Sequence, residues 1–419
     1  MNKTIRFAAM RNEPWQTWFV KLLCFFLCPF MAFLYSLKDI YSKSSYAIFF
    51  LFGVVFCWHM NSTGQGQYDD YIGIADRFVL NNETSIQYLR EQLCAYFSFS
   101  EFAPKELYDI VLMWCVHQFS DNPHLYFAVA SIPFLYFLLK SLSFITRRED
   151  FRLNIYTFII IILFLLPRDI ITVQNPRYST ATWMYVYAIL GFYFSDRLRI
   201  KYILLIAATP LIHAAFWVNV FIFFACIPLC KWFRWAFLVY CISIPFALPF
   251  ARFFTFIDIS FLPDSIERSV SNHITQDSIE RKSSGVGQSG FYWVGQTFLY
   301  YRYFMYILLA IIIAKTIKKN EAKEGDKQIF VFYLWFFALC NFVQTLPVIC
   351  ERLFFVVRIL GAILWYTFAY PRYNFFLLFL LSSCSMEILI RYFYNGAVYR
   401  VVPLDIFFCG FLKLILDYI

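Results

Sequence analysis

Apolar runs of about 20 residues, separated by short polar connections, repeat along most of the chain. An α-helix of this length crosses the hydrocarbon core of a bilayer. The strands of a membrane β-barrel would instead alternate apolar and polar positions, and these runs do not alternate. The pattern therefore predicts an all-α polytopic integral membrane protein with about 11–13 transmembrane helices.

The apolar runs predict helices at 45–60, 123–145, 152–167, 177–195, 201–213, 214–230, 235–257, 296–317, 328–346, 352–370, 373–392 and 403–418. One further run, 18–37, stays open. It is flanked by Arg11 on one side and Lys38 on the other, and basic flanks favour the same side of a membrane. The run therefore either spans the membrane or re-enters at Pro29.

Composition agrees with the pattern of runs. Hydrophobic residues make up 61% of the chain and charged residues only 15%, whereas soluble domains carry about 25% charged residues. We therefore expect a single transmembrane domain over residues 1–419. The net charge of +9 fits basic cytoplasmic loops and gives no reason to expect nucleic-acid binding. Because no small-residue cleavage site follows the first apolar stretch, we expect no signal peptide to be removed.

Basic residues in the connections set the expected orientation, because cytoplasmic loops are enriched in Lys and Arg. With these connections inside, four segments fall outside: 61–122, 167–177, 257–295 and 346–352. The first forms an extracytoplasmic loop region with short interfacial helices expected at 85–101 and 105–119. The Ser- and Gly-rich segment 257–295 is either a lid over an outer cavity or a solvated loop. The basic connections contain Lys38, Lys43, Arg147, Arg148, Arg152, Arg197, Arg199, Lys201, Lys231, Arg234, Lys315, Lys327 and Arg372.

Familiar motifs for nucleotides and metals are absent or lack their context. Gly285, Gly287 and Gly290 match GxGxxG, but no strand precedes them, so a flexible loop is the better interpretation. No metal site is expected, because the histidines show no mutual spacing: His59, His117, His124 and His273. Most of the 12 cysteines lie in apolar runs; Cys94 and Cys350 fall on the expected outer side, without an evident partner.

Cationic side chains gather at the outer ends of the predicted helices. Arg168 follows the helix 152–167, Arg177 opens the next helix, and His213 lies between two short helices. Arg352 opens the helix 352–370 and Arg358 lies further along it. A charge near lipid needs a partner or a wet cavity. Because arginine binds phosphate oxygens bidentately, this convergence indicates an anionic ligand such as a lipid diphosphate.

Acidic and aromatic residues supply the other candidates. Asp69, Asp70 or His213 is expected to deprotonate a sugar hydroxyl, and the sequence does not choose among them. The residues expected to contact a glycan are Tyr68, Tyr71 and Glu351. Structural roles are open for some of these residues: Arg168 and Arg352 as interfacial side chains, His213 as a hydrogen-bonding residue between helices, and Asp69 and Asp70 as helix caps.

The order of these segments resembles the EpsG/Wzy-type polysaccharide polymerases. The resemblance covers roughly residues 45–375 and rests on YDDYIGIADRF, QNPRYSTATWMYVYAIL, ATPLIHAAFWVNVF and ERLFFVVRILGAILWY. Two positions depart from the usual pattern of that family. Arg177 is followed by Tyr178 where Gln is usual, and His213 is followed by Ala214 where a small polar residue is usual.

The resemblance implies a GT-C-like fold and a lipid-diphosphate-dependent glycosyltransferase at the outer face of the bacterial inner membrane. Such enzymes transfer a glycan chain from undecaprenyl diphosphate to the non-reducing end of a second lipid-linked repeat unit. They use neither a metal nor another cofactor, since the lipid diphosphate is the leaving group. Donor and acceptor lipids are the expected partners, and a chain-length regulator and a flippase fit beside them. The residues expected to hold the diphosphate are Arg177, Arg358, Arg352 and Arg168.

Three other classes of membrane protein share part of this pattern. A flippase or transporter for lipid-linked sugars has a similar number of helices, but usually shows matching halves, and none is evident here. An O-antigen ligase shares the donor chemistry and differs only in the acceptor. An integral-membrane O-acyltransferase needs a catalytic signature on its cytoplasmic side, where this chain has only Lys and Arg.

Overall fold

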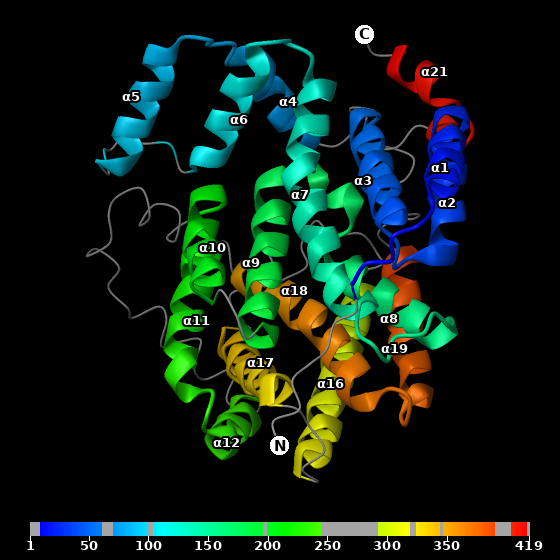
Figure 1. The fold of residues 1–419 in the computed structure, drawn as a ribbon. Coiled ribbons are helices and arrows are strands. Elements are labelled where there is room, and N and C mark those ends of the chain that lie inside the picture. The colour runs from blue at the N-terminus through cyan, green and yellow to red at the C-terminus, as the bar shows by residue number, and fades with distance from the viewer. Residues whose placement is uncertain are drawn as a thin grey trace.

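The computed structural model describes residues 9–60, 70–98, 100, 104, 106–195, 199–244, 292–318, 324–343, 347–389 and 404–416. This part of the chain is almost entirely helical and contains 17 α-helices (Figure 1). The loop predicted at 257–295 lies outside the described residues, apart from its last four, which belong to a helix. The result agrees with the predicted all-α class.

The helices are α1 (Trp15–Leu27), α2 (Pro29–Ser36), α3 (Lys43–Trp58), α4 (Asp70–Leu80), α5 (Ile86–Phe97), α6 (Leu107–His117), α7 (Pro123–Thr146), α8 (Ile155–Leu165), α9 (Pro176–Phe194), α10 (Arg199–Ile212), α11 (Phe216–Leu229), α12 (Phe233–Ser243), α16 (Tyr292–Lys318), α17 (Glu324–Phe342), α18 (Pro347–Leu364), α19 (Asn374–Ile388) and α21 (Phe411–Leu416). Short 3₁₀ turns extend or link them at Leu37–Asp39 (η1), Leu166–Arg168 (η2), Ile170–Gln174 (η3) and Leu404–Phe407 (η6). A π-helical turn, Trp365–Ala369, ends α18.

Most predicted helices are confirmed. The predictions 123–145 and 177–195 differ from α7 and α9 by no more than one residue at either end. The predicted helices at 85–101 and 105–119 are α5 and α6, each a few residues shorter. The prediction of one helix over 403–418 is wrong: η6 and the short α21 are separated by the non-helical residues 408–410, and an added Cβ at Gly410 would meet the carbonyl oxygen of Leu27 at 3.0 Å. The tight approach to α1 explains the interruption.

Helices α3 and α7 run in opposite directions between two ends of the molecule. At one end, the start of α3 meets the end of α7 through the Tyr46 hydroxyl and Thr146 Oγ1, 2.7 Å apart. At the other end, the side chain of His124 at the start of α7 lies 3.0 Å from the Trp58 carbonyl oxygen at the end of α3. The connections rich in Lys and Arg lie at the first end, which we call the basic end.

A buried ion pair ties two distant segments together at the basic end. Arg148 Nη2, just after α7, donates to Asp326 Oδ1 in the first turn of α17 at 2.9 Å. The Arg148 guanidinium also lies over the rings of Phe194 and Tyr366, at 5.2 and 5.7 Å from their centroids. We call the opposite end, where α4, α5 and α6 lie at the top of Figure 1, the cap end.

The run 18–37, left open by the sequence, is a helical hairpin that returns to the end where it starts. The Arg11 N–H donates to the Tyr41 carbonyl oxygen, and the Lys43 N–H donates to that of Arg11, both at 3.3 Å. The backbone before α1 therefore lies beside the backbone after η1. The turn is at Cys28, which is extended because the residue before a proline avoids helical geometry, and Pro29 then opens α2.

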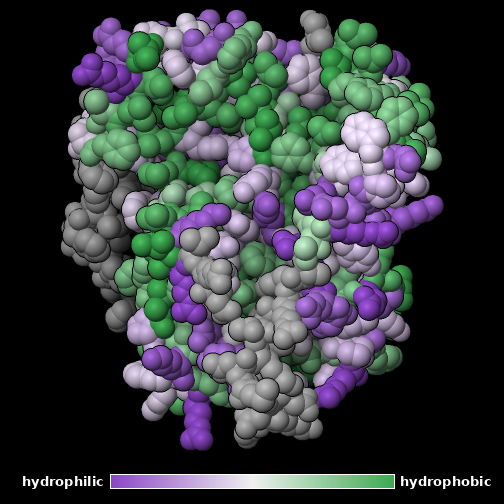
Figure 2. Space-filling model, viewed as in Figure 1, coloured by the Kyte–Doolittle hydropathy of each residue, from purple (hydrophilic) through white to green (hydrophobic). Residues whose placement is uncertain are grey.

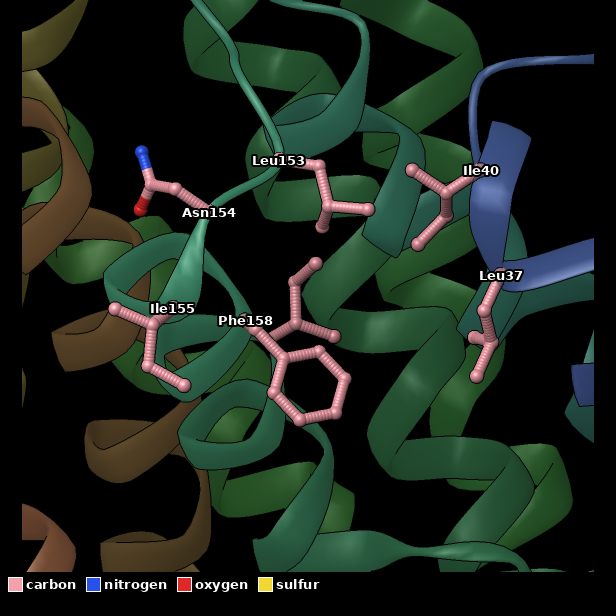
Figure 3. A pocket seen from close by; sticks show the side chains of 7 residues that line it. Leu37, Ile40, Leu153, Asn154, Ile155 and Phe158 are labelled. Carbon is pink, nitrogen blue, oxygen red and sulfur yellow. The ribbon is translucent and has the colours of Figure 1, made fainter.

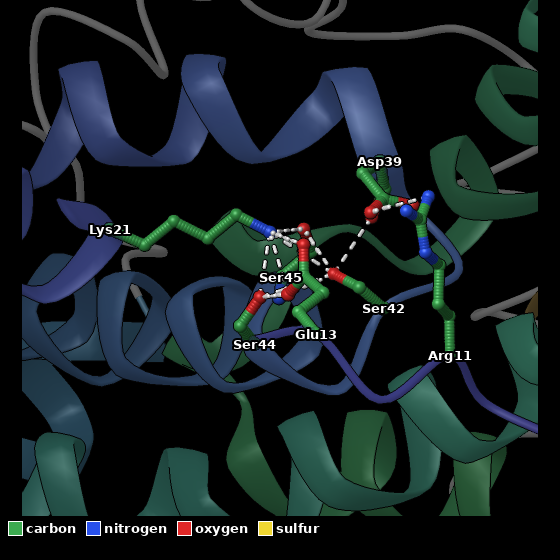
Figure 4. Close-up of polar contacts among 7 residues, drawn as sticks. All are labelled: Arg11, Glu13, Lys21, Asp39, Ser42, Ser44 and Ser45. Atoms are coloured by element: carbon green, nitrogen blue, oxygen red, sulfur yellow. Dashed lines mark hydrogen bonds and ion pairs between the residues drawn. The ribbon is translucent and has the colours of Figure 1, made fainter. Parts of the chain in front are cut away.

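A buried lysine fixes the hairpin against α3 (Figure 4). Lys21 is only 2% exposed, and its Nζ donates to Glu13 Oε1 at 2.9 Å. The same ammonium donates to the hydroxyl groups of Ser42, Ser44 and Ser45 at 3.1, 2.6 and 2.8 Å. Every proton of the ammonium thus has an acceptor, which is what a charge removed from water requires.

Helix surfaces and lengths are consistent with a helical membrane protein. Three described helical segments are long and apolar enough to cross a membrane: 123–146, 155–174 and 349–369. On α11, Trp217, Phe221 and Phe224 share one outward face, and Phe221 is 74% exposed. Figure 2 shows hydrophobic side chains over much of the upper part of one face and hydrophilic ones from its middle downward.

Small residues let the central helices approach each other closely. An added Cβ at Gly191 of α9 would lie 2.1 Å from the ring of Tyr202 on α10. At Gly361 of α18, an added Cβ would lie 2.4 Å from the ring of Tyr306 on α16. Close backbone approach at small residues is a usual means of packing helices in membranes. These contacts hold α9 and α18 against their neighbours near the ends of the two helices. The starts of the same two helices belong to the site described below.

An apolar groove opens between the hairpin and α8, at the basic end (Figure 3). It encloses 320 Å³ and is lined by Leu37, Ile40, Leu153, Asn154, Ile155, Phe158 and Ile161. Leu37 and Ile40 follow α2, whereas the other lining residues belong to α8 or directly precede it. The groove is thus separate from the charged side chains of the cap end.

Replacing Lys21 tests the anchoring of the hairpin. Lys21→Met should lower stability by about 3–5 kcal/mol, because it leaves the Glu13 carboxylate buried without its cation. Thermal unfolding of the detergent-solubilised protein measures the effect, with Lys38→Met at an exposed position as the control. Adding Glu13→Gln to Lys21→Met should restore part of the loss. Equal melting temperatures for the Lys21 and Lys38 variants would contradict this role.

Candidate functional site

Five segments distant in the sequence meet at the cap end. They are the start of α6, η2, the start of α9, the turn between α10 and α11, and the start of α18. Each contributes one or two polar side chains at the point where a helix begins or ends. We call Glu106, Asp109, Arg177 and His213 the charged cluster.

Local sequence places the charged cluster in the first turns of α6 and α9. The Asn175 side chain accepts from the Tyr178 N–H at 3.4 Å, and Pro176 occupies the first position of α9. Arg177 therefore projects from the first turn. Glu106 is the extended residue before α6, and Asp109 lies in that helix's first turn. Carboxylates are favoured there by the helix dipole.

Arg177 is held by two carboxylates. Its Nη1 donates to Glu106 Oε2 at 2.7 Å. Its Nε lies 3.0 Å from Asp109 Oδ2, an ion pair whose N–H is not aligned for a hydrogen bond. The other oxygen of Asp109 accepts from the Tyr126 hydroxyl at 3.1 Å. One guanidinium thus joins α6 to α9, and its charge is matched by two acids.

Glu106 also joins this pair to the turn between α10 and α11. Its Oε1 accepts from the Ala214 N–H at 3.3 Å and lies 3.5 Å from Nδ1 of His213. The same Nδ1 accepts from the Ala215 N–H at 3.2 Å. A neutral imidazole in this arrangement carries its proton on Nε2. Glu106 therefore touches a cation, a backbone amide and an imidazole at once.

Tyr178 lies beside the charged cluster and gathers two further arginines. The Arg168 guanidinium lies 4.3 Å from the centroid of its ring, and the Arg352 guanidinium 5.4 Å. The ring of His213 meets the same ring edge-on, with centroids 5.1 Å apart. The Tyr178 hydroxyl donates to the Arg352 carbonyl oxygen at 2.9 Å. We call Arg168, Tyr178 and Arg352 the arginine–tyrosine stack.

The segment that carries Arg168 is fixed onto α9. Trp183 Nε1 donates to the Arg168 carbonyl oxygen at 2.8 Å. The Asp169 carboxylate accepts from the Ile171 and Thr172 N–H groups at 3.1 and 3.3 Å, and so begins η3. The Ser179 hydroxyl donates to the Thr172 carbonyl oxygen at 2.7 Å. Arg168 therefore projects from a well-connected turn and not from a free loop.

Burial shifts the pKa of two groups in the cluster. Burial raises the pKa of Glu106 above its usual 4.5, and the nearby Arg177 charge acts in the opposite direction. Burial holds the pKa of His213 well below 6.5, and the charges of Arg352, Arg177 and Arg168 lower it further. His213 is therefore neutral near pH 7. Three of the four arginines expected at the outer face, Arg168, Arg177 and Arg352, thus lie close enough to His213 to interact with it.

Other predicted site residues are placed differently. Arg358 is buried six residues beyond Arg352 on α18, which corresponds to about 9 Å along the axis and about 240° around it. Its carbonyl oxygen accepts from the Tyr306 hydroxyl of α16 at 3.5 Å. Glu351 is exposed. Asp70 and Tyr71 open α4, but their side chains, and the residues Tyr68 and Asp69, lie outside the described part of the chain.

Sequence reasoning missed both acidic partners of Arg177. Glu106 and Asp109 are three residues apart in KELYDI, at the start of a predicted interfacial helix. This i, i+3 spacing puts two carboxylates on one face, a signal that was available in the sequence. Nothing in the sequence singles out Tyr178 except its departure from a family pattern, yet its ring is the centre of the arginine–tyrosine stack.

Within the described residues, no three side chains of His, Cys, Asp or Glu gather as metal ligands. His117 instead stacks on Phe78, with centroids 3.9 Å apart, and its Nδ1 lies 2.8 Å from Asp121 Oδ1. Comparisons of the sequence and the structure with models of protein families, curated proteins and solved structures find no match. The arguments for function therefore come from the charged cluster and the arginine–tyrosine stack.

Arg177 and Arg352 should respond differently to removal of their charge. Arg177→Met should lower stability by about 3–5 kcal/mol, because two buried carboxylates lose their cation. Adding Asp109→Asn should restore part of this loss. Arg352→Met, at a half-buried position, should change the melting temperature in detergent little. Similar melting temperatures for Arg177→Met and Arg352→Met would contradict the structural role of Arg177.

Proposed function

We propose that this chain is a lipid-diphosphate-dependent glycosyltransferase that polymerises surface polysaccharide. It would transfer a growing glycan from undecaprenyl diphosphate to the non-reducing end of a lipid-linked repeat unit at the outer face of the bacterial inner membrane. The observation that carries the proposal is the arginine–tyrosine stack, two guanidinium groups on one ring, beside a buried carboxylate and a neutral imidazole. The resemblance in motif order supports it, with a GT-C-like fold of about 11–13 helices.

The two stacked arginines suit a departing diphosphate. Negative charge builds on the phosphate oxygens as the bond from the sugar to the phosphate breaks. Fixed guanidinium groups in a site of low dielectric stabilise that charge more in the transition state than in the ground state. Among the described residues, no ion pair joins Arg352 to a carboxylate, whereas Arg177 is matched by two. We therefore assign the diphosphate to Arg352, with Arg168 beside it on the same ring, and give Arg177 a positioning role.

His213 is the group we assign to the acceptor hydroxyl. It is neutral near pH 7, as a general base must be. In the arrangement described above Nδ1 accepts from the Ala215 N–H and the proton is on Nε2, so acting as a base through Nε2 requires the other tautomer, with the proton moved to Nδ1. Glu106 Oε1, 3.5 Å from Nδ1, is placed to accept that proton in a hydrogen bond. The hydroxyl proton would then pass to Nε2 as the oxygen attacks the donor sugar and the diphosphate leaves.

The proposed orientation follows from the division of charge between the two ends. Basic connections favour the cytoplasmic side, so the cap end faces the periplasm, where lipid-linked repeat units are joined. The proposed reaction uses neither a metal nor another cofactor. Its partners are donor and acceptor lipids, with a chain-length regulator and a flippase acting beside it. A flippase or an O-antigen ligase is the competing class, and the experiment below separates these functions.

The length distribution of surface polysaccharide tests the proposal. In a deletion strain complemented with Arg352→Ala or Arg168→Ala, the ladder of long chains should collapse to a single repeat unit. Removing an arginine that binds the diphosphate removes stabilisation that appears in the transition state, so the rate of polymerisation should fall at least tenfold. A gel of extracted polysaccharide measures the ladder, and immunoblotting verifies equal amounts of protein in the membrane.

Arg152→Ala at the exposed basic end is the matched control and should keep the full ladder. Arg352→Lys should still impair chain growth, because an ammonium cannot reproduce the guanidinium fork. Loss of even the single repeat unit in the deletion strain would favour a flippase or a ligase. Normal ladders from both arginine variants would remove the stack from the mechanism.

The proposed base also predicts a pH profile. Because burial and three guanidinium groups hold the pKa of His213 well below 6.5, the polymerisation rate should stay level as pH falls from 8 to 6.5. It should decline only at lower pH, as the imidazole takes up a proton. Polymer formation in membrane vesicles measures the profile, and His213→Gln should abolish activity across the range. A midpoint at or above pH 6.5 would contradict the assignment.

A further inference from the structure

Two cysteines that are ten residues apart meet at the cap end, close to the arginine–tyrosine stack. Cys340 lies near the end of α17 and Cys350 in the first turn of α18. Their sulfur atoms are 3.7 Å apart. Each sulfur also lies 3.6 Å from the carbonyl oxygen of the other cysteine. These reciprocal contacts bring both the side chains and the backbones of the two residues together.

The environment of the pair is closed and aromatic. The Tyr303 hydroxyl lies 3.2 Å from the Cys340 sulfur and 3.5 Å from the Cys350 sulfur. The Tyr303 ring stacks on Phe354, with centroids 4.4 Å apart. Cys340 is fully buried, whereas Cys350 is 8% exposed. A reagent arriving from outside therefore reaches Cys350 first.

We propose that Cys340 and Cys350 are a disulfide-forming pair that fixes the first turn of α18, and with it Arg352, against α17. A disulfide needs a sulfur–sulfur distance of about 2.0 Å, so the two sulfur atoms approach each other by about 1.7 Å. Arg352 lies two residues after Cys350, and its carbonyl oxygen accepts from Tyr178. Oxidation thus restrains the backbone that presents one half of the arginine–tyrosine stack.

The reaction balances with a disulfide as the oxidant. The Cys350 thiolate attacks one sulfur of the oxidant, forms a mixed disulfide and releases the other sulfur as a thiolate. The Cys340 thiolate then attacks the Cys350 sulfur and releases the remaining half of the oxidant. Two protons leave the cysteines, and two electrons reduce the oxidant to two thiols. The availability of such an oxidant in the periplasm rests on the orientation given under the proposed function.

Tryptic digestion isolates both cysteines in one peptide. Residues 328–352 contain no Lys or Arg before Arg352, so Cys340 and Cys350 stay together after cleavage. The purified full-length protein in detergent is equilibrated with reduced and oxidised glutathione, denatured in acid and alkylated. In oxidising buffer this peptide should become two hydrogens lighter and take up no alkyl group. In reducing buffer it should take up two.

Controls separate this pair from other cysteines and from the polymerase proposal. Cys340→Ser should leave Cys350 able to form only a mixed disulfide with glutathione, and Cys94→Ser should change nothing in this peptide. Cys226 on α11 and Cys230, the residue directly after that helix, should stay alkylated throughout. Two alkyl groups on Cys340 and Cys350 in every buffer would overturn the inference, whatever the polysaccharide gel shows. A disulfide together with an unchanged ladder in the Arg352 variant would instead overturn only the proposed function.

Discussion

A guanidinium held between two buried carboxylates is the interaction on which the cap end depends. Arg177 contacts Glu106 and Asp109, so the start of α6 cannot move away from the start of α9 without leaving charges unpaired in a medium of low dielectric. Glu106 also accepts from the Ala214 N–H, which places the turn between α10 and α11 against the same point. The position of His213 is therefore a consequence of this ion pair and not of its own contacts alone.

Two similar buried pairs act at the basic end. Lys21 with Glu13 fixes the hairpin of α1 and α2 on α3, and Arg148 with Asp326 joins the end of α7 to the start of α17. In a membrane, apolar packing gains little over contact with lipid, because lipid tails are as apolar as leucine. A buried charged side chain has only one satisfactory partner. Ion pairs therefore select one arrangement of the helices among the many that apolar packing alone would allow. Buried ion pairs thus fix how the helices meet at both ends of the bundle, and apolar packing between these ends does not specify that arrangement.

The sequence predicted what depends on local periodicity and left open what depends on tertiary partners. Helices such as α7 and α9 follow directly from apolar runs, and their ends lie within a residue of the prediction. The sequence left open whether the run 18–37 spans the membrane or re-enters, because both of its flanks are basic. The backbone contact between Arg11 and Tyr41 shows that the run returns to the end where it starts. The segment 403–418 was predicted wrongly because the interruption comes from packing against Leu27. Similarly, the convergence of cations could be anticipated, and the i, i+3 spacing could have flagged Glu106 and Asp109, but their pairing with Arg177 is a tertiary contact that the sequence does not show.

The arginines of the site differ in how they are held, and this difference limits what each can do. A carboxylate holds a guanidinium by cancelling its charge, as at Arg177. An aromatic face attracts the same group through the quadrupole of the ring and leaves the positive charge in place. The guanidinium groups of Arg168 and Arg352 both lie against the Tyr178 ring, within reach of His213, and that of Arg168 also lies 3.9 Å from the centroid of the Phe355 ring. A site built to receive an anion needs both kinds of contact, one to fix the backbone and one to keep positive charge available. The adjacent residues Arg177 and Tyr178 supply them from a single helical turn.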